Sequence, residues 1–428
     1  MSPPGRPARR IAVVGAGWAG LAAAVEAVRQ GAQVTLFEMA HAAGGRARRV
    51  STTTGDFDNG QHILIGAYSA TLALMRRVGA DPQALLLRQP LRLIYPDGQG
   101  LALPAGAPLL AFIRAVLDAR GWRWSHRLAL LRKASGWLVK GFDCDPSLSV
   151  QQLCAGLPDP VLQDLVEPLC VAALNTPIEQ ASARVFLRVL RDALFAGRGS
   201  ADLLLPRAPL SDLLPDPAWA WLLAAGANCQ LGRRVQSLQR SDTGWRLDDE
   251  PFDGVVLACS AKEAARLAAP LEPRWSARAS ALRYQPIVTA YLADASLRLP
   301  QAMLALRAGA QAPAQFVFDL GALGTKPGCY AFVVSGAEPW LSQGLADCGQ
   351  LVLQQARKAF AGAFMAADVL QHLSAERRAT FACTPGLDRP PMTISADLVA
   401  AGDYIAGDYP ATLEGAVRSG LAAAQALA

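Results

Sequence analysis

A glycine-rich turn near the start of the sequence has the residue types and spacing that bind a diphosphate. The motif G-x-G-x-x-G is formed by Gly15, Ala16, Gly17, Trp18, Ala19 and Gly20. The first glycine permits a tight turn, the second lets the backbone approach a pyrophosphate, and the third lets a helix pack closely on a strand. Because the N-terminus of that helix carries partial positive charge, the motif predicts a dinucleotide site.

A carboxylate follows this turn at the distance that suits a ribose. Glu38 lies 18 residues after Gly20, at the end of an apolar segment. An acidic residue at this distance accepts a hydrogen bond from the ribose 2′-hydroxyl, whereas an arginine would favour a phosphorylated nucleotide. We therefore expect the dinucleotide to contain an unphosphorylated adenosine.

The residues around the motif predict the strand-helix-strand unit that this chemistry requires. Residues 10–14 are apolar enough for a buried strand, and residues 18–30 form an Ala-rich helical pattern that ends before Gly31. Residues 32–37 then alternate like a second strand. A lone G-x-G-x-x-G is a weak signal, but this one has the structural context that makes it specific.

Two further stretches separate a flavin from a nicotinamide cofactor. Gly44, Gly45 and Arg46 begin a segment with three arginines, which allows close backbone approach and a cation near the pyrophosphate; the alternative is a basic surface turn. The turn-rich stretch 56–62 follows, unlike the next helix of a nicotinamide dehydrogenase. In this order the motifs resemble the FAD-binding start of the amine oxidase and phytoene desaturase superfamily. The resemblance implies FAD as cofactor, with contacts from Gly45, Arg46, Gly60, Gln61 and His62.

The end of the sequence resembles the segment that closes the flavin site in the same superfamily. The similar residues are 401–404 and 410–420. The resemblance implies that Asp403 binds the ribityl chain and that the backbone amides of Thr412 and Leu413 face the pyrimidine edge of the flavin. A helix N-terminus there favours the negative charge of a reduced flavin.

One ambiguity concerns the acidic residue. The tetrapeptide Ala-Gly-Asp-Tyr occurs at 401–404 and again at 406–409, so Asp408 is an alternative to Asp403. The family has about eleven residues between the ribityl acid and the glutamate of the last helix, and Asp403 lies eleven residues before Glu414. This spacing favours Asp403.

The expected fold class is α/β, with a Rossmann-like FAD-binding domain and a mixed helical and β-sheet substrate domain. We expect strands at 231–238 and 252–259, and the resemblance implies that the Val235 backbone contacts adenine. The flavin domain is expected to combine 1–90, 210–268 and 385–428, and the substrate domain 91–209 and 269–384.

The stretch 109–141 has a net charge of +6, equal to that of the whole chain. It has seven basic residues and a single acidic one, and it interleaves Trp122, Trp124 and Trp137 with aliphatic residues at helical spacing. Basic amphipathic helices with tryptophan bind anionic membrane surfaces. The alternative is a solvated basic face whose tryptophans belong to the core. We do not expect nucleic-acid binding, because no known binding module surrounds this stretch.

A narrower resemblance joins the chain to the bacterial hydroxysqualene dehydroxylases of hopanoid synthesis, formerly called squalene-associated FAD-dependent desaturases. It extends from residue 11 to the C-terminus. Its motifs are 58–62, 167–177, 181–183, 189–192, 203–207 and 410–412. One departure is Tyr404 together with the second Gly-Asp, where the family has a Trp-Thr type continuation.

This resemblance implies reductive removal of the allylic hydroxyl of hydroxysqualene to give squalene. Cleavage of that C–O bond gives a resonance-stabilised cation, to which reduced flavin delivers hydride from N5. A dry apolar cavity would keep water from capturing the cation. His62 is the candidate acid for the leaving hydroxyl; the alternative is that His62 only shapes the flavin loop.

Two other functions stay open. A carotenoid-type desaturase or isoprenoid oxidase would use the same flavin motifs in the oxidative direction, and a prenyl-lipid carrier of this fold would hold no flavin. The electron donor is not identified, because the sequence has no second dinucleotide motif. A nicotinamide nucleotide or a reductase would fill that role.

Composition excludes several classes. With 428 residues, 52% of them apolar, the chain has material for two domains and a large core, so global disorder is excluded.

The eight cysteines contain no C-x-x-C pair, no export signal follows the N-terminus, and no apolar run reaches 18 residues. We expect free thiols and a cytoplasmic protein, peripheral on the inner face of the cytoplasmic membrane. The four histidines lack metal-ligand spacing and no G-x-S-x-G is present, so neither a metal site nor triad hydrolysis is expected.

Overall fold

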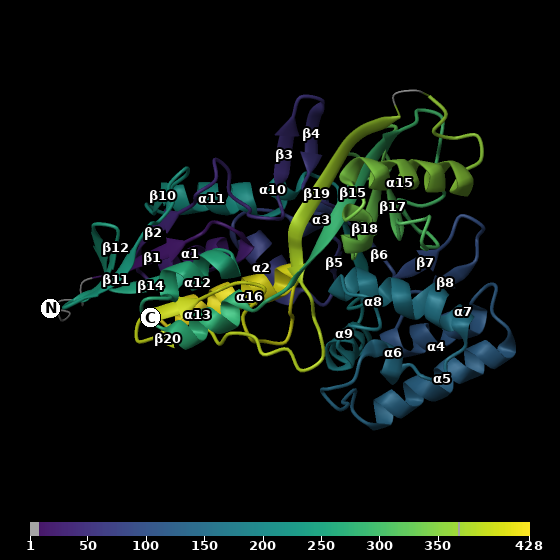
Figure 1. Cartoon of the computed structure of the whole chain (residues 1–428), viewed down its shortest axis with the longest axis horizontal. Coiled ribbons are helices and arrows are strands. Elements are labelled where there is room, and N and C mark those ends of the chain that lie inside the picture. The colour runs from purple at the N-terminus through teal and green to yellow at the C-terminus, as the bar shows by residue number, and fades with distance from the viewer. Residues whose placement is uncertain (1–7, 367–368) are drawn as a thin grey trace.

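A six-stranded sheet at one end of the molecule gathers three distant parts of the chain (Figure 1). The structure, a computed structural model, describes residues 8–366 and 369–428. The strand order is β10-β2-β1-β14-β21-β20, and all neighbours are parallel except β21 and β20. Their bounds are Arg10–Val14 (β1), Gln33–Phe37 (β2), Asn228–Gln230 (β10), Gly254–Leu257 (β14), Thr393–Ser395 (β20) and Leu398–Ala400 (β21).

The order of these strands creates a crevice at the end of β1. The chain leaves β1, passes through helix α1 (Trp18–Arg29) and returns on one side as β2, whereas β14 lies on the other side of β1. Ligands of open α/β sheets bind at such a switch in strand order, outside the carboxyl ends of the strands. The glycine-rich turn lies at this point because it directly follows β1.

Close helix packing holds this end of the molecule together. Helix α16 (Leu413–Gln425) lies against α1, and a Cβ atom placed on Gly420 would stand 2.1 Å from the Ala19 carbonyl oxygen. A Cβ on Gly20 would stand 1.8 Å from the carbonyl oxygen of Gly15. Both positions therefore need glycine so that backbone can approach backbone.

The predicted strand-helix-strand unit is confirmed to within one residue at each end. The predicted strand at 252–259 contains β14, but the one at 231–238 is wrong. Residues 231–234 are exposed, and Gly232 has a φ of +68° that interrupts an extended chain. This segment crosses the end of β2 instead, where Arg233 N–H donates to the Glu38 carbonyl oxygen over 2.9 Å.

A second, antiparallel sheet has the order β16-β17-β18-β15-β19. Its bounds are Tyr284–Ala293 (β15), Met303–Ala305 (β16), Phe316–Asp319 (β17), Cys329–Ser335 (β18) and Leu370–Phe381 (β19), and helix α15 (Leu345–Ala359) covers one face. The long strands β15 and β19 extend from this sheet toward the six-stranded sheet (Figure 1). They carry side chains from the second sheet to the crevice.

A helical region lies at the opposite end of the molecule from the C-terminus (Figure 1). Its main helices are α4 (Pro108–Asp118), α5 (Trp124–Val139), α8 (Glu167–Leu174) and α9 (Ala183–Phe195), with a π-helical turn at Leu162–Val166 before α8. The helical spacing predicted for 109–141 is confirmed. Trp122 and Trp137 are buried in the core, whereas Trp124 is 64% exposed.

Asn175 fastens this helical region to the second sheet. It ends α8 with a left-handed φ of 46°, donates to the Gln285 carbonyl and to Thr380 Oγ1, and accepts from Gly336 N–H. The stretch 167–177, which carries the narrower resemblance, thus connects the helical region to the second sheet.

The boundaries of the five predicted segments stay a prediction. β6 (Leu86–Gln89) and β9 (Leu203–Pro206) pair across two of those segments.

All eight cysteines are free thiols. Among the described residues, no helix has the length and hydropathy needed to cross a bilayer, and no cluster of His, Cys, Asp and Glu is placed to hold a metal.

Candidate functional site

A cavity of about 700 Å³ begins at the crevice and extends into the helical region. Its walls include most of the residues that the sequence predicted for the cofactor. These are Gly15, Gly17, Trp18, Ala19, Glu38, Gly45, Arg46, Gly60, Gln61, His62, Val235, Asp403, Thr412 and Leu413. Ala16 and Gly20 do not line the cavity, because Ala16 N–H donates to Glu38 and Gly20 packs on Gly15.

The glycine-rich turn leaves open space at one glycine only. Gly17 is the N-cap of α1, has a φ of −70° and receives no capping bond from a side chain. A Cβ there would meet only the Gly45 Cα atom, at 3.9 Å, so the fold itself does not require glycine. The first amides of α1 have no partners within the helix. This cradle fits a pyrophosphate, which would fill the space that a side chain would take.

Glu38 is fixed at the edge of this cradle. One of its carboxylate oxygens accepts from Ala16 N–H over 2.7 Å and the other from Ala40 N–H over 2.8 Å. Each carboxylate oxygen can accept a second hydrogen bond, so a ribose diol remains within its capacity. Val235 lies nearby and is buried, and its carbonyl accepts from Arg266. Together, the Glu38 carboxylate and the buried Val235 suit an adenosine.

Arg46 and Asp403 form an ion pair on the cavity wall, with 2.5 Å between Arg46 Nη2 and Asp403 Oδ1. Arg46 also donates to the Ala379 carbonyl. Burial acts against the charge of the guanidinium, but Asp403 more than offsets this, and the pKa of Arg46 is raised. The site therefore holds a fixed positive charge and a fixed negative charge side by side.

Asp408 has a different partner. It lies 2.9 Å from Arg188 of α9, and its side chain is 63% exposed, against 10% for Asp403. Both aspartates border the cavity, but only Asp403 contacts a cationic residue of the predicted cofactor motifs.

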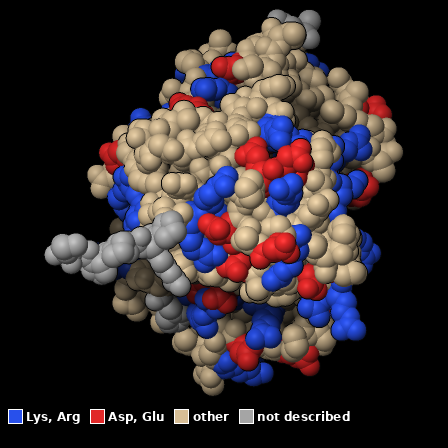
Figure 2. All heavy atoms as spheres, turned by 90° about the vertical axis from the view of Figure 1, so that its left-hand side faces the viewer, with Lys and Arg blue, Asp and Glu red and all other residues tan. Residues whose placement is uncertain are grey.

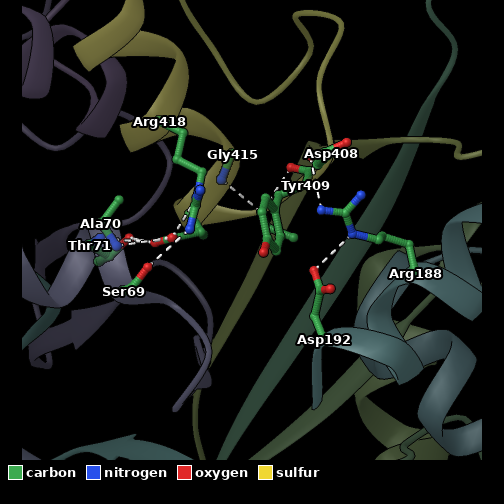
Figure 3. Close-up of polar contacts among 11 residues, drawn as sticks. Ser69, Ala70, Thr71, Arg188, Asp192, Asp408, Tyr409, Gly415 and Arg418 are labelled. Carbon is green, nitrogen blue, oxygen red and sulfur yellow. Dashed lines mark hydrogen bonds and ion pairs between the residues drawn. The ribbon is translucent and has the colours of Figure 1, made fainter. Parts of the chain in front are cut away.

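The sequence did not reveal the arrangement around Tyr409 (Figure 3). Its ring lies between two guanidinium groups, with Arg418 at 4.7 Å and Arg188 at 5.7 Å from the ring centre. Arg188 is also paired with Asp192. These contacts join α9 to the segment before α16. The only signal was the unusual second Gly-Asp-Tyr, which departs from the resembled family.

The start of α16 is anchored by a buried carboxylate. Glu414 is fully buried and accepts from Ala70 N–H, from Thr71 N–H and hydroxyl, and from Arg418 Nε. Thr412 Oγ1 accepts from Gly415 N–H as the N-cap. The helix N-terminus is thereby held with Thr412 and Leu413 at the cavity, where its dipole favours negative charge.

His62 borders the cavity and is only partly exposed. Burial lowers its pKa to about 4, and Nε2 lies 3.3 Å from the Asn59 carbonyl oxygen. The imidazole is therefore neutral near pH 7 and can donate one hydrogen bond, but it is not a charged acid. Asn59 also donates to Glu376 of β19, which borders the same cavity. Sequence reasoning missed Glu376 because 317 residues separate it from Asn59.

The far half of the cavity is apolar. Aliphatic and aromatic side chains from the second sheet, from residues 93–103 and from the helical region line it, among them Leu93, Leu103, Leu169, Phe186, Met303 and Phe318. Such walls exclude water and hold a large apolar molecule beside a polar reaction centre.

A Rossmann-type turn, a second glycine pair and the N-terminus of a C-terminal helix, all open to one cavity, define the class of dinucleotide-binding oxidoreductases. The chain belongs to the family of flavin containing amine oxidoreductases, whose family model matches residues 18–428. The protein is therefore a flavin-dependent oxidoreductase.

Two relatives match this chain over almost its full length. A hydroxysqualene dehydroxylase of Rhodopseudomonas palustris is 29% identical, with 97% of each chain covered. A probable zeta-carotene desaturase of Synechococcus elongatus is 25% identical, with 98% of each chain covered. Among solved structures, an oxidoreductase from Methanosarcina mazei superposes with a TM-score of 0.73 at 16% identity, covering 96% of this chain and 99% of that one, which shows the shared fold.

Proposed function

We propose that this protein binds FAD and reductively removes the allylic hydroxyl of hydroxysqualene to form squalene. The observation that carries the proposal is one continuous cavity with a dinucleotide cradle at one end and apolar walls at the other. The similarity to a hydroxysqualene dehydroxylase over 97% of the chain supports this choice of substrate.

The nucleotide half of the site supports FAD rather than a mononucleotide. The open space at Gly17, the carboxylate of Glu38 and the buried Val235 provide for a pyrophosphate, a ribose and an adenine in turn. We propose that Asp403 binds the ribityl chain while Arg46 fixes its carboxylate. The amides of Thr412 and Leu413 would face the pyrimidine edge of the ring.

Reduced flavin, when bound, would supply the hydride that replaces the hydroxyl. The reaction then asks two things of this chain. The apolar walls keep water from the allylic cation that C–O cleavage leaves. We propose that neutral His62 transfers its single N–H from the Asn59 carbonyl to the departing hydroxyl when the substrate binds; its other role would be to keep that N–H on Asn59 and shape the loop. Replacing His62 with alanine while flavin is retained separates the two roles, because only the first predicts loss of turnover.

An anaerobic single turnover tests the function. The purified protein is reduced chemically, so that no natural electron donor needs to be known, and hydroxysqualene is added. We expect the oxidised-flavin absorbance to return with one squalene formed per flavin. A folded, flavin-loaded protein whose flavin stays reduced would contradict the proposal.

The second candidate is an isoprenoid desaturase, favoured by the similarity to the zeta-carotene desaturase. It predicts the opposite direction: oxidised flavin would be bleached anaerobically by a carotene. A flavin-free lipid carrier would instead be colourless and take up no FAD, which membership of a flavin oxidoreductase family argues against.

We also propose that helices α4 and α5 contact a membrane surface. Among the described residues, six of the ten exposed large hydrophobic side chains lie on these two helices: Leu110, Leu117, Trp124, Leu128, Leu138 and Val139. Exposed basic residues surround them, including Arg114, Arg123 and Arg132. Flotation with vesicles containing phosphatidylglycerol tests this. We expect binding that weakens in salt and in the triple Glu variant of those arginines.

A further inference from the structure

A second cavity of about 340 Å³ lies beneath helices α4 and α5. Among the described residues, Ser135 is the only one in its lining that is neither aliphatic nor aromatic. Leu109 and Ile113 contribute from α4, and Leu131 and Trp137 from α5. A cavity with such walls has no partners for ordered water, so it suits a hydrocarbon.

Only one layer of side chains separates this cavity from the first. Six residues line both: Phe112, Leu165, Leu169, Phe186, Leu190 and Leu194. These side chains are apolar, and apart from the buried Leu165 and Phe186 they are only partly buried. Rotation of one or two of them would join the cavities, because side-chain rotamers exchange rapidly where packing is incomplete.

The other side of the second cavity reaches the surface. Ser135 and Leu138 line the cavity and are exposed. Leu138 stands next to Val139, which is 87% exposed, on the helix that also carries Trp124 and Leu128. The cavity therefore connects the exposed apolar side chains of α5 with the apolar half of the flavin-side cavity.

We propose that the second cavity receives the isoprenoid chain from the bilayer and, during turnover, holds the end of the chain remote from the reacting carbon. This inference rests on the proposed function and adds a path and a binding site for the substrate. The chain would pass from one hydrocarbon environment to another without crossing water, so its transfer would not expose apolar surface.

Trp137 offers a test that needs no turnover, because its indole lines the second cavity and is nearly buried. A dibrominated straight-chain alkane is added to the oxidised holoenzyme without vesicles, and tryptophan fluorescence is followed. We expect saturable quenching that is largely lost in Trp137→Phe and is reversed by squalene. Equal quenching in both proteins, or quenching that squalene does not reverse, would overturn the proposal.

A matched pair of variants tests the role in turnover. Ala134→Trp places an indole in the second cavity, whereas Gly136→Trp places one on the same helix where a Cβ meets nothing within 4 Å. Each is assayed with hydroxysqualene and with a ten-carbon allylic alcohol too short to reach that cavity. We expect the ratio of kcat/KM for the long over the short alcohol to fall at least about tenfold in Ala134→Trp alone.

The outcomes separate this proposal from the function on which it rests. Equal ratios in the two variants, with flavin content unchanged, would overturn the role of the second cavity. Absence of turnover with either alcohol in the unmodified protein would instead overturn the proposed dehydroxylation, and the quenching result would still decide whether the cavity binds isoprenoid chains.

Discussion

The two ends of the main cavity bind by different means. At the nucleotide end, backbone amides, a helix N-terminus and a few fixed charges line the cavity, and Gly17, Glu38 and Arg46 each have a defined geometry. At the apolar end no single side chain has a comparable geometric role. Many aliphatic groups together give this part of the cavity its shape. Local sequence motifs therefore specify the first end, whereas only tertiary packing specifies the second.

The surfaces of the two ends differ in the same way. Figure 2 faces the nucleotide end and shows basic and acidic side chains intermingled. Pairs such as Arg234 with Glu263 account for this mixture. On α4 and α5, by contrast, basic residues surround exposed apolar ones, and Asp118 is the only acidic residue. One surface suits water, and the other suits an anionic interface.

Two glycine substitutions should have the largest effects at the nucleotide end: one should prevent folding, and the other should prevent flavin binding. In Gly20→Val the new side chain would meet the Gly15 carbonyl, so we expect no cooperative unfolding transition. In Gly17→Val the new side chain would fill only the ligand's space. We expect that variant to lose bound flavin but to melt within about 3 °C of the flavin-free parent. Calorimetry and absorbance together check both outcomes, and retention of flavin by Gly17→Val would refute the assigned cradle.

A truncation at the apolar end should cost stability without loss of flavin. Phe186 is buried and lines both cavities, so Phe186→Ala removes a large side chain at a site already bordered by empty space. We expect a loss of about 3 kcal/mol in the free energy of unfolding, at the low end for such a change. Urea denaturation measures the loss, and flavin content near one per chain is the control.

The two aspartates of the repeated tetrapeptide should differ in their effect on flavin affinity. Asp403→Ala leaves Arg46 without its partner, and we expect at least about a tenfold weaker affinity, or 1.4 kcal/mol. Asp408→Ala breaks an exposed pair with Arg188, so less than about a threefold change is expected. Flavin titration of the apoprotein distinguishes them; equal effects would reopen the choice between the two residues.

The last expected effect is a change in the pH dependence of stability. Burial holds the pKa of His62 at about 4, whereas an unfolded histidine titrates near 6.5. Unfolding therefore takes up a proton between these values, and stability is lost as the pH falls through this window. Between pH 7 and pH 5, His62→Gln should lose about 1 to 2 kcal/mol less stability than the parent. Parallel losses in the two proteins would mean that His62 is protonated in the folded state.

The sequence predicted much of the nucleotide end because each of its determinants lies within a short motif. The spacing of the residues predicted the turn after β1 and the position of Glu38, whereas the start of α16 was predicted from the resemblance to the superfamily. The failures have tertiary causes. The segment 231–238 has apolar residues at Leu231, Val235 and Leu238, but Gly232 and contacts with the end of β2 make it cross the end of that strand. Glu376 and the second cavity depend on segments that only folding brings together.

The contact between α1 and α16 also has a consequence for the order of events during synthesis. Gly420 lets α16 approach the Ala19 backbone, yet α16 leaves the ribosome some four hundred residues after α1. Until then the side of α1 that packs on α16 is uncovered, and the cavity lacks Thr412 and Leu413. Uncovered apolar surface of this kind promotes aggregation and recruits chaperones. The cofactor site is thus complete only after the last helix has been synthesised, so capture of the flavin is expected late.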